Sequence, residues 1–193
     1  MSGTPADPRH NPSRHPVARA GLAALGILLT CACMGCSAMP KGAVPVTGFQ
    51  KERYLGKWYE IARLDHVFER NMDNVYAEYT VAGDGFIGVT NRGYNYRKHR
   101  WQEAKGKARF RGSDTVGALE VSFFGPIYGA YNIIALDPDY KYALVAGNSR
   151  KYLWILSREK QIPAHIKDNY LQIAGKLGFD VGKLIWVRHD EGP

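Results

Sequence analysis

The chain has 193 residues, of which 45% are apolar and 12% aromatic, and its formal net charge is +8. This length fits one domain with a tail, and the apolar content is sufficient for a core. Lysine and arginine are scattered instead of gathered in one run or on one helical face, so the charge indicates a solvated surface and not a nucleic-acid-binding protein.

All three cysteines, Cys31, Cys33 and Cys36, lie close together near the N-terminus. The later part of the chain therefore has no means of forming a disulfide or a thiolate metal site. Cys33 and Cys36 have C-x-x-C spacing, but they close an apolar run and lack the packed context that a redox or zinc site needs.

That apolar run, AGLAALGILLTCACMGC, follows three arginines, Arg9, Arg14 and Arg19. It is too short to span a bilayer comfortably, and a short apolar run after basic residues is typical of a secretory leader.

Gly35 before Cys36 and Ser37 after it resemble the lipobox of bacterial lipoproteins, in which the cysteine thiol receives diacylglycerol and becomes the mature N-terminus. Cys33 stands where that motif usually has leucine, and Cys33 itself is the alternative acylation site. A cleaved signal peptide without lipid is the other interpretation. The predicted division of the chain is a signal peptide over residues 1–35, a lipidated tether over 36–48 and a folded domain over 49–193.

The folded domain is predicted to be all-β. A first strand begins at Gly56 and alternates through Trp58, and seven further strand-like segments follow at residues 75–81, 86–91, 100–111, 118–124, 130–137, 142–146 and 152–157. The connections are too short for parallel crossovers, so neighbouring strands must be antiparallel. Eight such strands can close into an up-and-down barrel whose interior holds one small ligand.

One helix is predicted after the eighth strand, in PAHIKDNYLQIAGKLGF. Its apolar residues recur at spacings of four, three and four: Ile166, Tyr170, Ile173 and Leu177. Pro163 suits the first turn and Gly178 the C-terminal cap. We expect the helix to pack on the outside of the barrel, followed by a short strand over residues 184–187.

Three segments carry a family resemblance, in the order YLGKWYEIARLDHVFER, IIALDPDYKYALVAG and YLWILSR. They resemble the three motifs of the lipocalin family, and the resemblance covers residues 49–189. It implies the eight-stranded barrel with one C-terminal helix outside it. It also implies that Gly56 and Trp58 start the first strand, and that Trp58 closes the narrow end of the barrel with Arg158 across it.

Counting alternate residues back from Arg158 predicts which residues of its strand face the barrel interior, and on the other strands alternate residues that share one face are predicted to do the same. The predicted lining is Tyr152, Trp154, Leu156, Val121, Phe123, Tyr131 and Ile133, with core filling as the competing interpretation of each. Glu60 shares the parity of Trp58 and is the candidate for a lone carboxylate in the cavity, although an outward or rim position is favoured for it.

No catalytic motif is found, so the protein is predicted not to be an enzyme and to need no cofactor. Gly83, Gly85 and Gly88 spell G-x-G-x-x-G, but a strand follows where a nucleotide site needs a helix. The sequence has neither G-x-S-x-G nor H-E-x-x-H. The histidines of the domain do not fall at metal-ligand spacing.

The leading hypothesis is a lipid-anchored protein that carries a fatty acid or a (lyso)phospholipid in an apolar cavity, because the resemblance implies that role in envelope maintenance. Ser37 after Cys36 favours the bacterial outer membrane, with the domain facing the periplasm. A haem or tetrapyrrole carrier and a non-catalytic envelope interaction module are the alternatives. Homodimerisation through the barrel mouth is left open.

Overall fold

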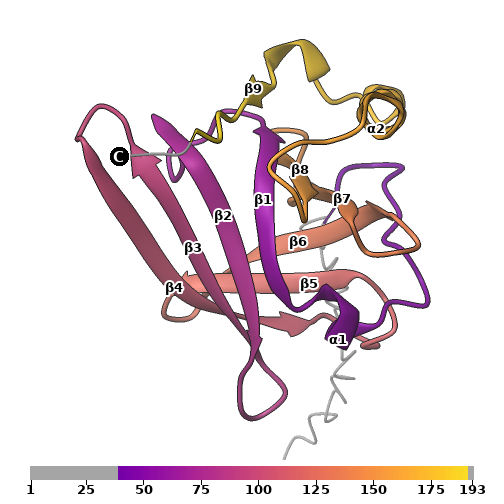
Figure 1. Ribbon diagram of the computed structural model, residues 1–193. Helices are drawn as coiled ribbons and strands as arrows, with labels where there is room; N and C mark the ends of the chain where they lie inside the picture. The colour runs from indigo at the N-terminus through magenta and orange to yellow at the C-terminus, as the bar shows by residue number, and fades with distance from the viewer. Residues whose placement is uncertain (1–38, 191–193) are drawn as a thin grey trace, which may run out of the picture. The chain divides into compact units, whose positions relative to one another are not determined.

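The structure is a computed structural model that describes residues 39–190 (Figure 1). Its strands are β1 (Gly56–Arg63), β2 (Met72–Val81), β3 (Ile87–Asn95), β4 (Arg100–Phe110), β5 (Ala118–Phe124), β6 (Ile127–Leu136), β7 (Tyr142–Ala146), β8 (Leu153–Ser157) and β9 (Ile185–Trp186). Its helices are α1 (Lys51–Tyr54), α2 (Ala164–Lys176) and a 3-10 turn, η1 (Val181–Lys183). The predicted leader and the first three residues of the predicted tether, 36–38 with Cys36 among them, lie outside the described residues.

Strands β1 to β8 form a closed antiparallel barrel. Each strand pairs with the next along the chain, and β1 pairs with both β8 and β2, which closes the ring. The predicted eight-stranded up-and-down barrel is therefore confirmed. β9 pairs with the last two residues of β1, Ala62 and Arg63.

Because the strands run alternately up and down, their connectors alternate between the two ends of the barrel. One end, called the mouth, carries the β1–β2, β3–β4, β5–β6 and β7–β8 connectors, which are residues 64–71, 96–99, 125–126 and 147–152. The other end, called the base, carries α1 and the remaining connectors.

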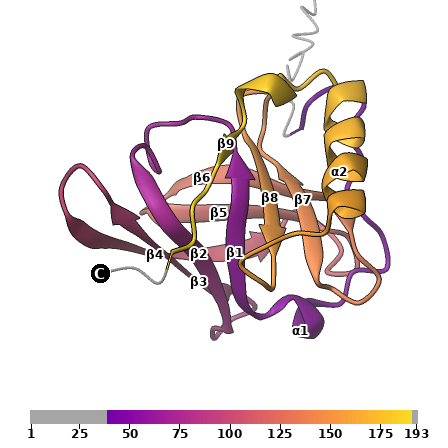
Figure 2. The same ribbon diagram turned by 45° about the horizontal axis from the view of Figure 1, so that its top comes forward.

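Two apolar clusters hold the molecule together. One lies inside the barrel and includes Trp58, Tyr79 and Leu156. The other lies between the outer face of the sheet and α2, where Tyr170 and Ala174 are buried (Figure 2). The helix therefore packs outside the barrel as predicted, because its apolar stripe covers an apolar part of the outer sheet face.

The element boundaries differ from the prediction where the chain departs from simple alternation. β2 begins at Met72, before the predicted start at residue 75. The prediction missed these first residues because Asn74, with a positive φ of 52°, lies in a bulge that interrupts the alternation. Pro163 is the N-cap of α2 and not a residue of its first turn. Helix α1 was not predicted, since four residues are too few to show a helical period.

Candidate ligand-binding site

Trp58 closes the base of the barrel. It is completely buried, and its Nε1 donates a hydrogen bond to the Tyr54 carbonyl oxygen at 2.8 Å. The Arg158 guanidinium lies over the indole, with Cζ 4.0 Å from the ring centroid. A cation at this distance from an indole face contributes about 0.5 to 2 kcal/mol.

The Arg158 guanidinium also donates hydrogen bonds to three backbone carbonyls at the base of the barrel. Nη1 donates to the Lys57 carbonyl and Nη2 to the Arg53 carbonyl, both at 2.8 Å, and Nε donates to the Tyr140 carbonyl at 3.2 Å. Gly56 permits the approach, because it has a φ of 90° and a Cβ there would lie 3.4 Å from Nη1.

Three tyrosine hydroxyls meet in the lumen above Trp58. Tyr54 and Tyr131 are joined at 2.7 Å, and Tyr79 donates to Tyr131 at 2.8 Å. Burial raises the pKa of all three hydroxyls, so they stay neutral. Three hydroxyl protons serve two hydrogen bonds among these residues, which leaves one proton able to donate to a ligand oxygen.

Most of the predicted lining belongs to the apolar cluster inside the barrel. Leu156 and Ile133 are buried there, whereas Trp154, Tyr131, Val121 and Phe123 are half-buried. Tyr152 is different, because it precedes β8 at the mouth and stacks on Trp154 with ring centroids 6.2 Å apart. Tyr79 and Phe110 also belong to the interior cluster and were not predicted, although alternation along β2 and β4 would have found them.

Glu60 faces the interior, as its shared parity with Trp58 indicated, and neither the favoured rim position nor a lone carboxylate is found. Its Oε1 lies 2.7 Å from Arg63 Nη1, and the two side chains are only 4% and 1% exposed. The pairing of β1 with β8 shifts by one residue between Glu60 and Ala62. This bulge at Ile61 resets the alternation, so Glu60 and Arg63 both face the interior.

A second carboxylate extends this polar network toward the mouth. Glu69 Oε2 accepts a hydrogen bond from Trp154 Nε1 at 3.1 Å. The same oxygen lies 2.9 Å from His66 Nε2, but the angle between these two groups does not suit a hydrogen bond. Arg63 Nη2 donates to the carbonyl oxygens of Glu69 and Met72, at 2.6 and 3.2 Å.

The two carboxylates of the network have opposite pKa shifts. Burial and the nearby Glu69 raise the pKa of Glu60 well above its ordinary value. Burial acts on Glu69 as well, but the interactions with His66 and Trp154 outweigh it and hold the pKa of Glu69 below its ordinary value. Glu60 is therefore the group that keeps a proton more readily, and Glu69 the one that ionises more readily.

The chain after β9 covers the gap that opens between β1 and β2 where both strands bulge. Val187 N–H donates to the Ile61 carbonyl at 3.0 Å, and Asn74 N–H donates to the Arg188 carbonyl at 2.8 Å. The Arg188 side chain also pairs with Asp73 at 2.6 Å. The backbone groups that the bulges release from the sheet thus find partners in the tail.

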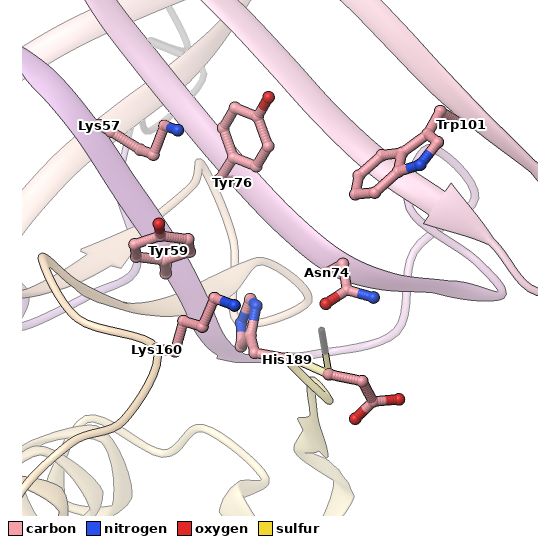
Figure 3. A pocket seen from close by; sticks show the side chains of 8 residues that line it. Lys57, Tyr59, Asn74, Tyr76, Trp101, Lys160 and His189 are labelled. Atoms are coloured by element: carbon pink, nitrogen blue, oxygen red, sulfur yellow. The ribbon is translucent and has the colours of Figure 1, made fainter. Parts of the chain in front are cut away.

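Outside the barrel, a groove of about 300 Å³ lies next to this tail (Figure 3). It is lined by Lys57, Tyr59, Asn74, Tyr76, Trp101, Lys160, His189 and Asp190. The Tyr59 side chain points to this outer groove, because its neighbour Trp58 points inward, so the groove is separate from the lumen.

The described residues contain no group of three or more His, Cys, Asp or Glu placed to hold a metal ion. Over the same residues, no helix is long and apolar enough to cross a membrane. The barrel interior is lined by apolar side chains and contains two polar clusters. One is formed by the tyrosine hydroxyls near the base, and the other is the Glu60–Arg63–Glu69 network nearer the mouth.

The family model of the Lipocalin-like domain matches residues 49–189. The chain belongs to the lipocalin family. Among its lipocalin relatives, "Outer membrane lipoprotein Blc" of Citrobacter freundii is 54% identical over 149 residues, which are 77% of this chain and 84% of the relative. The protein of the same name from Vibrio cholerae is 49% identical over 155 residues, 80% of this chain and 91% of the relative.

Two more distant similarities are found, one in sequence and one in fold. "Temperature-induced lipocalin-1" of Arabidopsis thaliana is 35% identical, over 72% of this chain and 78% of the relative. The solved structure of insecticyanin from the tobacco hornworm Manduca sexta matches with a TM-score of 0.63 and 23% sequence identity. The match covers 77% of this chain and 85% of the insecticyanin chain. The second likeness concerns the fold alone.

Proposed function

We propose that this lipocalin binds an amphiphile with one acyl chain, a fatty acid or a lysophospholipid, in the lumen of its barrel and carries it for maintenance of the cell envelope. The observation that carries the proposal is the interior lining, in which apolar and aromatic side chains such as Val121, Phe123 and Trp154 remain half-buried above a sealed base. Partly exposed apolar side chains inside a barrel suit a ligand that completes their burial.

The energetics of such a ligand are adequate for transport. Burying one methylene contributes about 0.8 kcal/mol, and a chain of a dozen carbons contributes roughly 10 kcal/mol before costs. Ordering and association losses reduce the net binding free energy to about 8 kcal/mol, which corresponds to micromolar affinity. An affinity in this range allows both loading and release.

The polar network favours one orientation of the ligand. Arg63, Glu69 and Trp154 Nε1 lie on the mouth side of the apolar lining, where a charged or polar headgroup stays close to water. The acyl chain then extends toward the base, and the spare proton of the tyrosine cluster is available to an oxygen that reaches that depth.

We infer further that Cys36 is acylated after removal of residues 1–35, with Cys33 as the alternative, and that residues 36–48 tether the domain. The relatives named outer membrane lipoprotein support placement at the outer membrane with the barrel facing the periplasm. Several acyl chains on one residue are enough for stable anchoring.

Extraction of the bound ligand tests this function. The full chain is expressed in a Gram-negative host, purified from the membrane, and extracted with organic solvent for mass spectrometry. We expect acyl lipid in amounts comparable to the protein. A Soret band in the visible spectrum would instead favour the haem alternative. An empty barrel that also fails to take up added fatty acid would contradict lipid carriage and favour an interaction module.

A further inference from the structure

The exposed apolar side chains of this lipocalin are concentrated at the mouth. Of the ten large apolar residues that are exposed in the part of the chain that the structure describes, eight lie in mouth connectors or in strand residues at that end. They are Val67, Phe68, Tyr96, Trp101, Phe124, Ile127, Ile185 and Trp186. Single exposed apolar residues are ordinary on a soluble surface, but a collection at one end of a molecule indicates contact with an apolar partner.

The four most exposed of these eight residues form two pairs on opposite sides of the mouth. Val67 and Phe68 belong to the β1–β2 connector, and Phe124 and Ile127 flank the β5–β6 turn. These four side chains are 64% to 74% exposed. The two connectors are half a circuit apart in the barrel, so the apolar groups border the opening and do not form one patch on its flank.

The other two mouth connectors are cationic. The β3–β4 connector carries exposed Arg97 and Lys98, and the β7–β8 connector carries exposed Arg150 and Lys151. Around the mouth, apolar and cationic connectors therefore alternate. This arrangement complements a surface that presents phosphate groups above an apolar interior.

The carboxylates of the mouth connectors do not cancel this charge. Asp65 is paired with Arg70 at 2.8 Å, and Glu69 is turned into the interior network. At the base, by contrast, the connectors 82–86, 111–117 and 137–141 carry four aspartates and two basic residues, Arg111 and Lys141, the latter 3.7 Å from Asp139. The two ends of the barrel thus differ in both charge and exposed apolar surface.

The barrel wall is lowest beside the β5–β6 turn. The pairing of β4 with β5 reaches only to Lys107 and Ser122, and β5 ends at Phe124, so residues 100–104 of β4 extend past the end of β5. A groove of about 590 Å³ lies beside this turn, with Lys105, Lys107 and Pro126 in its lining. The groove combines cationic and apolar groups next to Ile127, which suits a lipid headgroup leaving or entering the lumen.

The start of the described chain lies at the mouth end. Gly42 packs against Leu177 at the end of α2, where a Cβ on the glycine would lie 3.6 Å from Cδ2. The Leu177 carbonyl accepts a hydrogen bond from Arg150 Nε in the β7–β8 connector at 2.6 Å. From Gly42 the chain runs beside α2 toward the base, where Thr47 pairs with Val116 (Figure 2).

This placement limits where an anchor attaches. Cys36 precedes Met39 by three residues. Three residues span at most about 11 Å even when fully extended. An acyl group on Cys36, as proposed above, is thus attached within about 11 Å of Met39, where the described chain starts at the mouth end.

We propose that the mouth of this lipocalin docks directly on a membrane that contains anionic phospholipid, with the apolar connectors at the headgroup and acyl boundary and the cationic connectors on phosphates. The orientation rests on the proposed acylation of Cys36. The lumen then opens onto the leaflet, and a lipid passes between membrane and barrel without crossing water. A membrane is favoured over a protein partner because the anchor and the phosphate-complementary charges lie at this same end.

Site-directed labels on the acylated full chain test the orientation. Phe68→Cys, Ile127→Cys and, as the matched control at the base, Val81→Cys are each labelled with an environment-sensitive fluorophore, since all three positions are exposed. The proteins are reconstituted into phosphatidylethanolamine vesicles with phosphatidylglycerol and with spin-labelled quencher lipid. We expect a blue shift and strong quenching at Phe68 and Ile127, and neither at Val81.

Charge reversal tests the electrostatic part. Arg97→Glu with Lys98→Glu should lower quenching at Phe68 severalfold in the anionic vesicles and leave it unchanged in phosphatidylcholine vesicles, because each basic residue near an anionic surface favours binding about fivefold. Circular dichroism establishes that each variant is folded. Labels that remain in water at the mouth, quenching at Val81 instead, or a blue shift of the mouth labels in the absence of vesicles would overturn the proposal. The last outcome would indicate that protein and not membrane covers the mouth.

The failure of this proposal is separable from failure of the proposed function. Lipid recovered from a protein whose mouth labels stay in water would leave carriage intact and exclude docking. Docked labels on a barrel that never holds lipid would show the reverse. The mass of the purified protein reports acylation independently of both.

Discussion

Glu60 and Arg63 form an ion pair inside the barrel, 2.7 Å between Oε1 and Nη1, with almost no access to water. The pair exists because a single bulge in β1 turns two side chains three positions apart toward the same interior. Removing two charged groups from water is costly, and the cost is offset here by the mutual attraction and by the carbonyl partners of Arg63. The network is therefore sensitive both to pH and to the loss of either partner.

The first prediction concerns pH. Burial raises the pKa of Glu60 above its ordinary value of 4.5, so the native state holds this proton more tightly than the unfolded chain does. The free energy of unfolding should therefore fall as pH rises from that ordinary value through the raised pKa. Glu60→Gln cannot ionise and should lack this fall. Urea unfolding across the pH range measures it, with the exposed Glu78→Gln as control; identical pH slopes for Glu60→Gln and the wild type would contradict the assignment.

The second prediction concerns the pair itself. Arg63→Met should lower the free energy of unfolding by about 3 to 5 kcal/mol, because it leaves a buried carboxylate network without its cation. The double variant Glu60→Gln, Arg63→Met should recover part of this loss, since one uncompensated acid is removed. A double-mutant cycle by urea denaturation at neutral pH measures the coupling. Strict additivity of the two changes would mean that the side chains do not interact in solution.

The third prediction concerns the base. Trp58→Ala should cost about 3 to 5 kcal/mol of stability, as for other buried aromatic residues, because it leaves a cavity and removes the surface on which Arg158 rests. Trp101→Ala is the matched control, since that indole is 37% exposed. Thermal unfolding compares the two. Equal effects of the two substitutions would be inconsistent with Trp58 as the closing residue.

The fourth prediction concerns the tyrosine cluster. Tyr131→Phe should destabilise the protein more than either Tyr54→Phe or Tyr79→Phe, because its hydroxyl is the shared partner of the other two. The expected cost is about 1 to 3 kcal/mol, the range for leaving buried polar groups unpaired. Chemical denaturation of the three single variants gives the ranking. A smaller effect at Tyr131 than at its neighbours would refute the arrangement.

The fifth prediction tests the lumen. Val121→Trp places a large side chain into the interior from β5, where the facing residue on β6 is Gly129. It should weaken binding of a fluorescent fatty acid at least tenfold by occupying the space of several methylenes, each contributing about 0.8 kcal/mol. Glu78→Trp, on the outer face of β2, is the control. Unchanged affinity with a folded Val121→Trp would place the ligand elsewhere.

Much of the interior was predictable because alternation along a strand is local. Trp154, Leu156, Val121 and Phe123 follow strict period two, and each lies inside the barrel as counted. Tyr152 did not follow, because β8 begins one residue later and Tyr152 belongs to the mouth connector. The partner of Glu60 was missed for the related reason that counting in twos cannot detect an inserted residue.

The order of strands, the shortness of their connectors and the three motifs determine by themselves that this chain closes into a lipocalin barrel, because adjacent strands joined by short turns have no pairing choice other than their neighbours. Only the tertiary structure decided which polar groups meet inside and which end of the barrel receives the start of the chain. A bulge, a covering tail and the path of residues 39–48 beside α2 bring together groups far apart along the chain, and no local pattern in the sequence records such contacts.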